Sequence, residues 1–359
     1  MSQIVEPIQG PVLDEPLAPG AVEAPRLARH QITLADGHQV GVTIAGKGVP
    51  LVVVHGFSVE GFLYAQSLSR LVSMGFRVIA IDTAGHGATQ GLPLSGQNLN
   101  EYAALLGRVV DDLGITHYLL AGHSMGGQLV TRLAASRPEQ VMGVVLIDAI
   151  VGDTWDRMVY LFRVAPPLLS AVGTALMVES AMVVPAFTDP RQATKLLRLV
   201  VPTLVSHATH PWRLLGPTAS ILRTRSSRYA LDEMAEHGVP LFALHGTRDI
   251  GVPLQTSKDA VRRTDGVLVE VHGAGHSWPL RDPETLPAIV AELMGAELGA
   301  AIRDGLRGAG LTATEPTLED VEGVCYTPNA RVFSLQPATG RRTVVGRHRR
   351  PKYRWTTTR

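Results

Sequence analysis

Short apolar runs that end in glycine, histidine or aspartate constrain the fold of this chain more than any other feature. They follow one another along the sequence at Leu51–Val54, Arg77–Ile81, Tyr118–Ala121, Val141–Ile147, Leu241–Leu244 and Val267–Val271. They are rich in β-branched residues and apolar on both faces, as strands must be when helices cover both sides of a sheet. Amphipathic segments of helical length lie between several of them, at about residues 60–73, 98–113, 126–137 and 254–263. The pattern predicts an α/β fold with a mostly parallel sheet, flanking helices and a site at the carboxyl ends of the strands.

A hairpin and a helical insertion complete the expected architecture. Residues 31–44 contain two β-like runs around Ala35-Asp36-Gly37, which predicts a hairpin before the first apolar run. The alternation stops in residues 151–238, an apolar segment interrupted by prolines that is too long for a simple loop. It predicts a helical cap inserted after the sixth strand. The expected organisation is a disordered lead-in (1–29), a core in two parts (30–150 and 239–297), the cap (151–238) and a basic C-terminal extension (298–359).

Composition excludes several classes of protein. Hydrophobic residues make up 45% of the chain and charged residues 18%, with a formal net charge of +1, so a buried core is expected and nucleic acid is not expected as a partner. Residues 1–25 are acidic and proline-containing, unlike a signal peptide, and no segment reaches the roughly 20 uninterrupted apolar residues of a membrane span. A cytoplasmic protein is the expectation. Cys325 is the single cysteine, so no disulfide can form within the chain.

The C-terminal extension is strongly basic. From Gly323 onward the chain holds nine arginine or lysine residues and no aspartate or glutamate. The expectation is a solvated extension that is dispensable for turnover. The alternative is weak contact with an anionic membrane surface, which such basic residues favour by about 1 kcal/mol each.

A serine nucleophile is predicted at a turn between a strand and a helix. Gly122-His123-Ser124-Met125-Gly126 follows the run Tyr118–Ala121 and precedes a helix-like stretch. A sharp turn of this kind exposes the serine Oγ, and its glycines let the backbone pass without a clash. The alternative is a glycine-containing turn in which Ser124 only caps the helix.

The nucleophile needs a base, and the base needs an acceptor for its other N–H. His276, in Gly273-Ala274-Gly275-His276-Ser277 after the last run, is the best candidate for the base. Asp249 follows the preceding run and is the expected acceptor, with Asp148 as its rival at the end of an earlier strand. The chain order serine, aspartate, histidine favours Asp249.

Backbone N–H groups are expected to bind the oxyanion that forms during acyl transfer. One is that of Met125, and the other comes from the loop after Val54, where Phe57 is the best candidate. The loop Asp82–Gly87 lacks the lysine and the serine or threonine of a phosphate-binding loop, so it is expected to be a structural turn.

Five motifs in this order resemble those of the α/β-hydrolase superfamily. They are LVVVHGF at 51–57, DTAGHG at 82–87, GHSMGG at 122–127, HGTRDIGVP at 245–253 and GAGHS at 273–277, and the resemblance covers about residues 30–297. It implies a Ser-His-Asp triad with an oxyanion hole that acts on esters or related acyl compounds, without a metal or organic cofactor. Haloalkane dehalogenases and most epoxide hydrolases of the superfamily carry aspartate at the position of Ser124, so the serine argues against both activities.

The expected function is hydrolysis of a small hydrophobic carboxylic ester through an acyl-serine intermediate. Apolar cap residues between Val159 and Phe187 are expected to divide between the core of the cap and the wall of an acyl pocket. The alternatives are carbon–carbon-bond hydrolysis, lyase or perhydrolase chemistry on the same triad, and a receptor that keeps the fold to capture a ligand.

Overall fold

The apolar runs of the sequence form the strands of a central sheet. The computed structural model describes residues 22–25, 27–57, 64–93, 98–182, 212–224, 226–335, 342–345 and 350–359, together with the single residues 201, 205 and 209. The strands of the main sheet are β2 (Ala28–Thr33), β3 (Gln39–Ala45), β4 (Val49–Val54), β5 (Phe76–Ile81), β6 (Tyr118–His123), β7 (Val141–Ile147), β8 (Leu241–Gly246), β9 (Val267–Val271) and β11 (Trp355–Thr358). Within this described part, they lie in the order β11-β9-β8-β7-β6-β4-β5-β3-β2. Strands β4 to β9 pair in parallel, whereas β2, β3 and β11 pair antiparallel to their neighbours.

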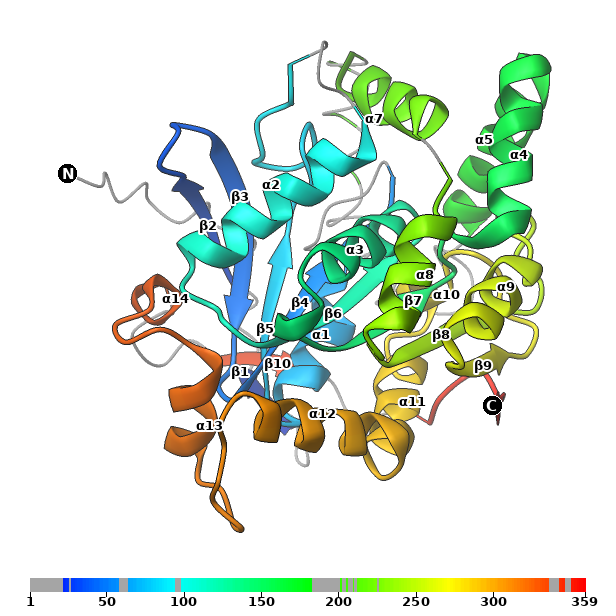
Figure 1. Cartoon of the computed structure of the whole chain (residues 1–359). Helices are drawn as coiled ribbons and strands as arrows, with labels where there is room; N and C mark the ends of the chain where they lie inside the picture. The colour runs from blue at the N-terminus through cyan, green and yellow to red at the C-terminus, as the bar shows by residue number, and fades with distance from the viewer. Residues whose placement is uncertain are drawn as a thin grey trace.

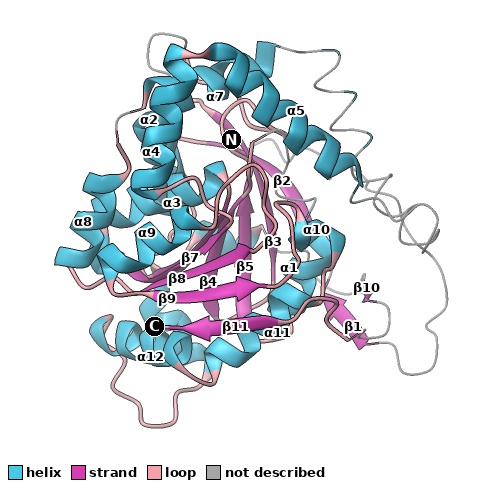
Figure 2. Cartoon of the chain, turned by 90° about the vertical axis from the view of Figure 1, so that its right-hand side faces the viewer, coloured by secondary structure: helices cyan, strands magenta, loops and turns pink. Residues whose placement is uncertain are grey.

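Helices cover both faces of this sheet (Figures 1 and 2). One face carries α2 (Leu99–Asp112), α3 (Met125–Ser136), α8 (Arg228–Glu236) and α9 (Gln255–Thr264), and the other carries α1 (Ala65–Val72), α11 (Thr285–Met294) and α12 (Glu297–Gly308). Every residue of β5, β6, β7 and β8 is buried as a result. The short elements η3 (Pro138–Gln140) and α10 (Trp278–Arg281) complete the core. The predicted α/β fold with a mostly parallel sheet is confirmed.

The helical cap follows β7, which is the sixth strand of the main sheet along the chain, as predicted. It contains α4 (Gly152–Val164), α5 (Pro166–Met182) and α7 (Trp212–Arg223), which lie beyond the carboxyl ends of the strands (Figure 1). The chain bends by 120° between α4 and α5, where Pro166 and Pro167 prevent a continuous helix. No single helix in the described part of the chain is long and apolar enough to cross a bilayer, although two bent pairs, 152–164 with 166–176 and 285–294 with 297–308, meet the same test when taken together.

The cap ends earlier than the sequence indicates. Residues 228–236 were expected to belong to it, but they form α8, which packs against α3 and α9 on the flank of the sheet. Ala230, Leu231 and Met234 are the buried residues of this helix. Their spacing gives α8 an apolar stripe, and its main neighbours are the core helices α3 and α9, so α8 belongs to the core.

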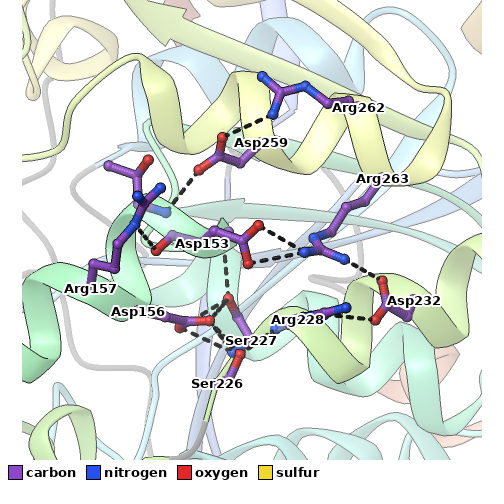
Figure 3. A network of polar contacts seen from close by, with 12 residues as sticks. Asp153, Asp156, Arg157, Ser226, Ser227, Arg228, Asp232, Asp259, Arg262 and Arg263 are labelled. Atoms are coloured by element: carbon purple, nitrogen blue, oxygen red, sulfur yellow. Dashed lines mark hydrogen bonds and ion pairs between the residues drawn. The ribbon is translucent and has the colours of Figure 1, made fainter.

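A polar network fastens the base of the cap (Figure 3). The Asp156 carboxylate in α4 accepts hydrogen bonds from the Ser226 hydroxyl and from the N–H and hydroxyl of Ser227. The Gly152 N–H donates to Ser227 Oγ at 2.8 Å, and Arg263 of α9 forms ion pairs with both Asp153 and Asp232. The segments that enter and leave the cap are therefore tied to each other and to the core.

The lead-in and the C-terminal extension differ from their expected forms. Residues 1–21 of the expected disordered lead-in lie outside the described residues, but β1 (Val22–Pro25) pairs antiparallel with β10 (Arg342–Val345). Beyond residue 297, α12, α13 (Leu318–Cys325) and α14 (Arg331–Ser334) continue the fold. Of the basic run 347–350, only Arg350 is described.

Residues beyond 297 pack onto the core through an ion pair, aromatic rings and a strand pairing. The buried guanidinium of Arg77 donates to Glu322 at 2.6 Å and lies 4.9 Å and 4.5 Å from the ring centroids of Tyr326 and Phe333. Strand β11 pairs with β9 and thereby becomes the edge strand on this side of the sheet. The expected boundary near residue 297 therefore does not mark the end of the folded domain, and the extension is not simply solvated.

Candidate active site

Ser124 lies on a strained turn between β6 and α3. Its backbone has φ 53° and ψ −117°, in a region that non-glycine residues avoid and that costs of order 1–3 kcal/mol. The Ser124 N–H donates to Ile147 O at 2.9 Å, which ties the turn to β7. A Cβ atom added at Gly126 would lie 2.2 Å from Val54 O, so only glycine lets the start of α3 pass this close to β4. The local geometry is that of a serine held at the carboxyl edge of the sheet.

His276 and Asp249 form a direct hydrogen bond. The His276 Nδ1–H donates to Asp249 Oδ2 at 2.7 Å, and both side chains are almost fully buried. The other carboxylate oxygen, Asp249 Oδ1, accepts the N–H groups of Gly251 at 2.9 Å and Val252 at 2.8 Å. These bonds fix the carboxylate and leave the second ring nitrogen of His276 as the acceptor for a proton.

The charges of this pair stabilise each other. Burial disfavours the imidazolium, but the charge and hydrogen bond of Asp249, with smaller contributions from Asp148 and Glu179, raise the pKa of His276 to about 9. Burial likewise opposes ionisation of Asp249, yet interaction with His276 keeps the pKa of Asp249 below its usual value. The arrangement therefore favours an imidazolium beside a carboxylate, which is the charge state that a base reaches after it takes a proton.

Asp148, the rival acid, lies in the same region without a hydrogen bond to His276. It is completely buried, and its Oδ1 accepts the Gly246 N–H at 2.8 Å. Burial and the nearby charge of Asp249 raise the pKa of Asp148 well above its usual value. The imidazole of His276 donates its hydrogen bond to Asp249 and not to Asp148, so the geometry favours Asp249 as the acid.

The two loops expected to form an oxyanion hole lie side by side. Strands β4 and β6 are parallel neighbours in which Val54 pairs with Gly122. Phe57 and Met125 each follow this pair by three residues. A Cβ atom added at Gly56 would lie 3.1 Å from Ser124 Cβ, which places the loop before Phe57 directly against the turn.

A chain of hydrogen bonds that no sequence motif predicts links Tyr64, through the residue before the nucleophile, to the backbone of the base. His123 Nε2–H donates to the backbone oxygen of His276 at 3.0 Å, which leaves His123 Nδ1 to accept the hydroxyl of Tyr64 at 2.8 Å. Burial, together with the charge of His276, lowers the pKa of His123 to about 3, so this ring is neutral. In the sequence, only the position of His123 beside the nucleophile indicated a role for that residue, and no motif indicated a role for Tyr64.

The structure also brings together three groups that could in principle ligate a metal. One ligand atom each from Asp148, His245 and Asp249 lie within 4.8 Å of one another. However, His245 Nε2–H donates to Val252 O at 2.9 Å, and its Nδ1 lies 2.8 Å from Ser257 Oγ. Both ring nitrogens and the oxygens of Asp249 already have protein partners, so the donor set does not fit a metal ion.

The loop at 82–87 is braced by histidines, as expected of a structural turn. The Thr83 N–H donates to His55 Nε2 at 2.9 Å, and His86 Nδ1 lies 3.0 Å from Thr83 Oγ1. Asp82 accepts the Ala88 N–H at 3.2 Å.

The raised pKa of His276 predicts an alkaline pH profile. A base must be unprotonated to act, so kcat/KM is expected to rise with pH and to level off only above about pH 9, rather than near the ordinary histidine value of 6.5. The measurement is kcat/KM for an uncharged ester between about pH 5 and about pH 10.5. The rates are corrected for spontaneous hydrolysis of the ester. A rising limb centred near pH 6 would contradict the proposed influence of Asp249 on His276.

Comparisons with known proteins show the family and the fold of the chain. Residues 49–283 match the family described as "Serine aminopeptidase, S33". A protein of Mycobacterium phage D29, provisionally named a non-heme haloperoxidase, is 33% identical over 72% of this chain and 92% of its own length. Haloalkane dehalogenase 2 of Mycobacterium tuberculosis is 29% identical over 70% of this chain and 89% of its own length. The solved structure of an esterase from Exiguobacterium antarcticum has a TM-score of 0.60 at 19% identity and covers 74% of this chain and 99% of that structure, a likeness that concerns the fold.

Proposed function

The chain belongs to the serine aminopeptidase (S33) family of the α/β-hydrolase superfamily, and on that premise we propose that it hydrolyses hydrophobic carboxylic esters through an acyl-Ser124 intermediate. The observation that carries the proposal is the 2.7 Å hydrogen bond between His276 and Asp249 at the edge of the sheet where Ser124 lies on its strained turn. A buried histidine so paired is suited to take a proton from a serine hydroxyl.

The proposed reaction has two halves, acylation of Ser124 and hydrolysis of the acyl-enzyme. His276 Nε2 takes the proton of Ser124 Oγ as that oxygen attacks the ester carbonyl. The N–H groups of Phe57 and Met125 bind the resulting oxyanion. Collapse breaks the ester bond, and His276 gives the proton to the leaving alcohol. A water molecule, deprotonated by His276, then attacks the acyl-serine. As the acyl bond breaks, His276 returns the proton to Ser124 Oγ, which releases the carboxylic acid and free Ser124.

Apolar cap residues support the choice of a hydrophobic substrate. Val159 and Phe162 are buried with the core, whereas Tyr160, Leu161 and Leu168 are exposed. Leu176 of α5 lies against Gly251 in the loop that carries Asp249, which makes it a candidate wall for the acyl group. The apolar side chains expected to contribute between Met177 and Phe187 are not among those that the structure describes.

A series of p-nitrophenyl esters of increasing acyl length tests the substrate class. We expect kcat/KM to rise from acetate to hexanoate or octanoate, because each methylene that becomes buried stabilises the bound state by about 0.8 kcal/mol. Equal or faster hydrolysis of the acetate ester would refute a hydrophobic acyl pocket.

Perhydrolysis is a second candidate, favoured by the relative of Mycobacterium phage D29 whose name refers to a haloperoxidase. In that reaction hydrogen peroxide replaces water in the attack on acyl-Ser124, and the product is a peracid with free serine. Peracid formation from acetate and peroxide at a rate above that of ester hydrolysis would favour this alternative. The haloalkane dehalogenase relative does not lead us to propose dehalogenation, because Ser124 stands where that chemistry uses a carboxylate.

A further inference from the structure

Helix α5 of the cap lies against both loops that carry the acid and the base. A Cβ atom added at Gly251 would lie 2.1 Å from Leu176 Cδ2, and one added at Gly275 would lie 2.2 Å from Glu179 Oε1. Leu176 and Glu179 are three residues apart, so they lie on the same side of the helix. Glycine in each loop leaves the space in which this side of α5 approaches the backbone.

The Glu179 carboxylate binds the backbone of the loop that carries the base. Its Oε1 accepts the N–H of Ser277, the residue directly after His276, at 3.2 Å. Its Oε2 is buried and has no hydrogen-bond partner in the part of the chain that the structure describes. Burial of this oxygen without a partner costs free energy, and burial raises the pKa of Glu179 above its usual value.

We infer that Glu179 is a positioning residue, through which the docked cap holds the His276 loop in line with Asp249. The inference rests on the proposed serine-hydrolase function. It also draws on the polar network at the base of the cap, where Asp156 and Arg263 tie α4 to the core (Figure 3). Because α4 leads directly into α5, a fastened base restricts where Glu179 can lie.

The effect of Glu179 on His276 is distinguishable from that of the other charges in the site. The titratable groups that act on His276 or Glu179, or on which these two act, are Asp148, Asp249, His123, His245 and Tyr353. If Glu179 is counted with these groups, it is the one that lies in the described part of the cap. A negative Glu179 favours the imidazolium, so removal of its charge is expected to lower the pKa of His276.

Two substitutions separate the charge of Glu179 from its hydrogen bond. Glu179→Gln keeps an oxygen that can accept the Ser277 N–H but removes the charge. We expect its plateau kcat to stay within about threefold of the wild-type value, while the rising limb of kcat/KM moves to lower pH by about one unit. Glu179→Ala removes both, and we expect kcat to fall about tenfold or more with KM changed less than about twofold, because the base is no longer held in place.

The matched control is Glu236→Gln in α8, which removes an exposed carboxylate of the same charge. It should leave kcat and the pH profile as in the wild-type protein. If Glu179→Gln keeps the wild-type pH profile and Glu179→Ala keeps the wild-type kcat, the inference is wrong. A lower melting temperature of Glu179→Ala with unchanged kcat would also overturn it.

A measurement without turnover keeps this inference separate from the proposed function. In a Ser124→Ala background, NMR titration of isotope-labelled histidine reads the pKa of His276 with and without Glu179→Gln. A lower pKa in the double variant supports the inference, and an unchanged pKa overturns it. Absence of ester hydrolysis by the wild-type protein would instead refute the proposed function.

Discussion

Replacement of Ser124 by alanine is expected to lower kcat for a p-nitrophenyl ester by about 10⁴-fold or more, because the variant has no oxygen that can form the acyl-enzyme. His276→Ala should cause a loss of similar size. The double variant should be hardly slower than either single one, since the nucleophile and the base act as a unit. Initial rates under substrate saturation, together with labelling by a fluorophosphonate probe, measure both effects.

Circular dichroism and melting temperature serve as the controls for folding of these variants. Alanine keeps the Cβ atom of Ser124 and therefore the backbone strain, so the alanine variant should melt close to the wild-type temperature. Turnover by Ser124→Ala above about a tenth of the wild-type rate, against the loss expected for a missing nucleophile, would show that another residue is the nucleophile.

The same assay separates the two candidate acids. Asp249→Asn should lower kcat by orders of magnitude, because an amide cannot stabilise the imidazolium or fix the tautomer in the same way. Asp148→Asn should have a much smaller effect, since Asp148 makes its hydrogen bond to the Gly246 N–H rather than to His276. The opposite ranking of the two variants would assign the acid to Asp148.

Removal of residues 350–359 is expected to destabilise the protein and to slow turnover. The segment supplies strand β11 and buries Tyr353, which alone accounts for about 2 kcal/mol. Hydrogen bonds such as that from the Lys352 N–H to Asp282 Oδ2 at 2.7 Å add roughly 1 kcal/mol each. A loss of about 4 kcal/mol is a large part of the 5–15 kcal/mol by which domains are stable, and for a chain of this length it should lower the melting temperature by roughly 5 °C.

Turnover should suffer because the segment binds the chain on both sides of His276. On one side, the His272 N–H donates to Arg354 O at 2.8 Å; on the other, Lys352 binds Asp282. We expect kcat of the truncated protein to fall about tenfold at a temperature where it stays folded. A synthetic peptide of residues 350–359 added in trans should restore part of the activity.

Arg359→Ala is the matched control for the truncation. It removes only an ion pair between Arg359 and Glu297 at the surface, worth about 1 kcal/mol or less. Its melting temperature and kcat should stay close to the wild-type values. If the truncated protein also keeps both, β11 is dispensable, and the original expectation of an extension unconnected with catalysis stands.

Local features of this protein were predictable from its sequence because they depend on neighbours along the chain. The apolar runs from Leu51 to Val271 form strands because their composition suits burial on both faces. Gly126 and its neighbours predict the strained turn at Ser124 because only small residues allow that backbone path. The candidate residues Ser124, Asp249 and His276 could be named for the same reason: each follows a strand whose carboxyl end lies at one edge of the sheet.

Contacts between distant segments were decided by the tertiary structure alone. The choice between Asp249 and Asp148 depends on which carboxylate meets the imidazole of His276, and both follow strands in the same way. Glu179 gave no signal among the apolar residues of the cap, because its contact with Ser277 exists only when α5 docks. The basic residues around Tyr353 indicated a solvated tail, since composition reports average polarity. The pairing of β11 with β9 was not predictable from side-chain patterns, because it consists of backbone hydrogen bonds. The edge of β9 that β11 covers exists only once the sheet has formed.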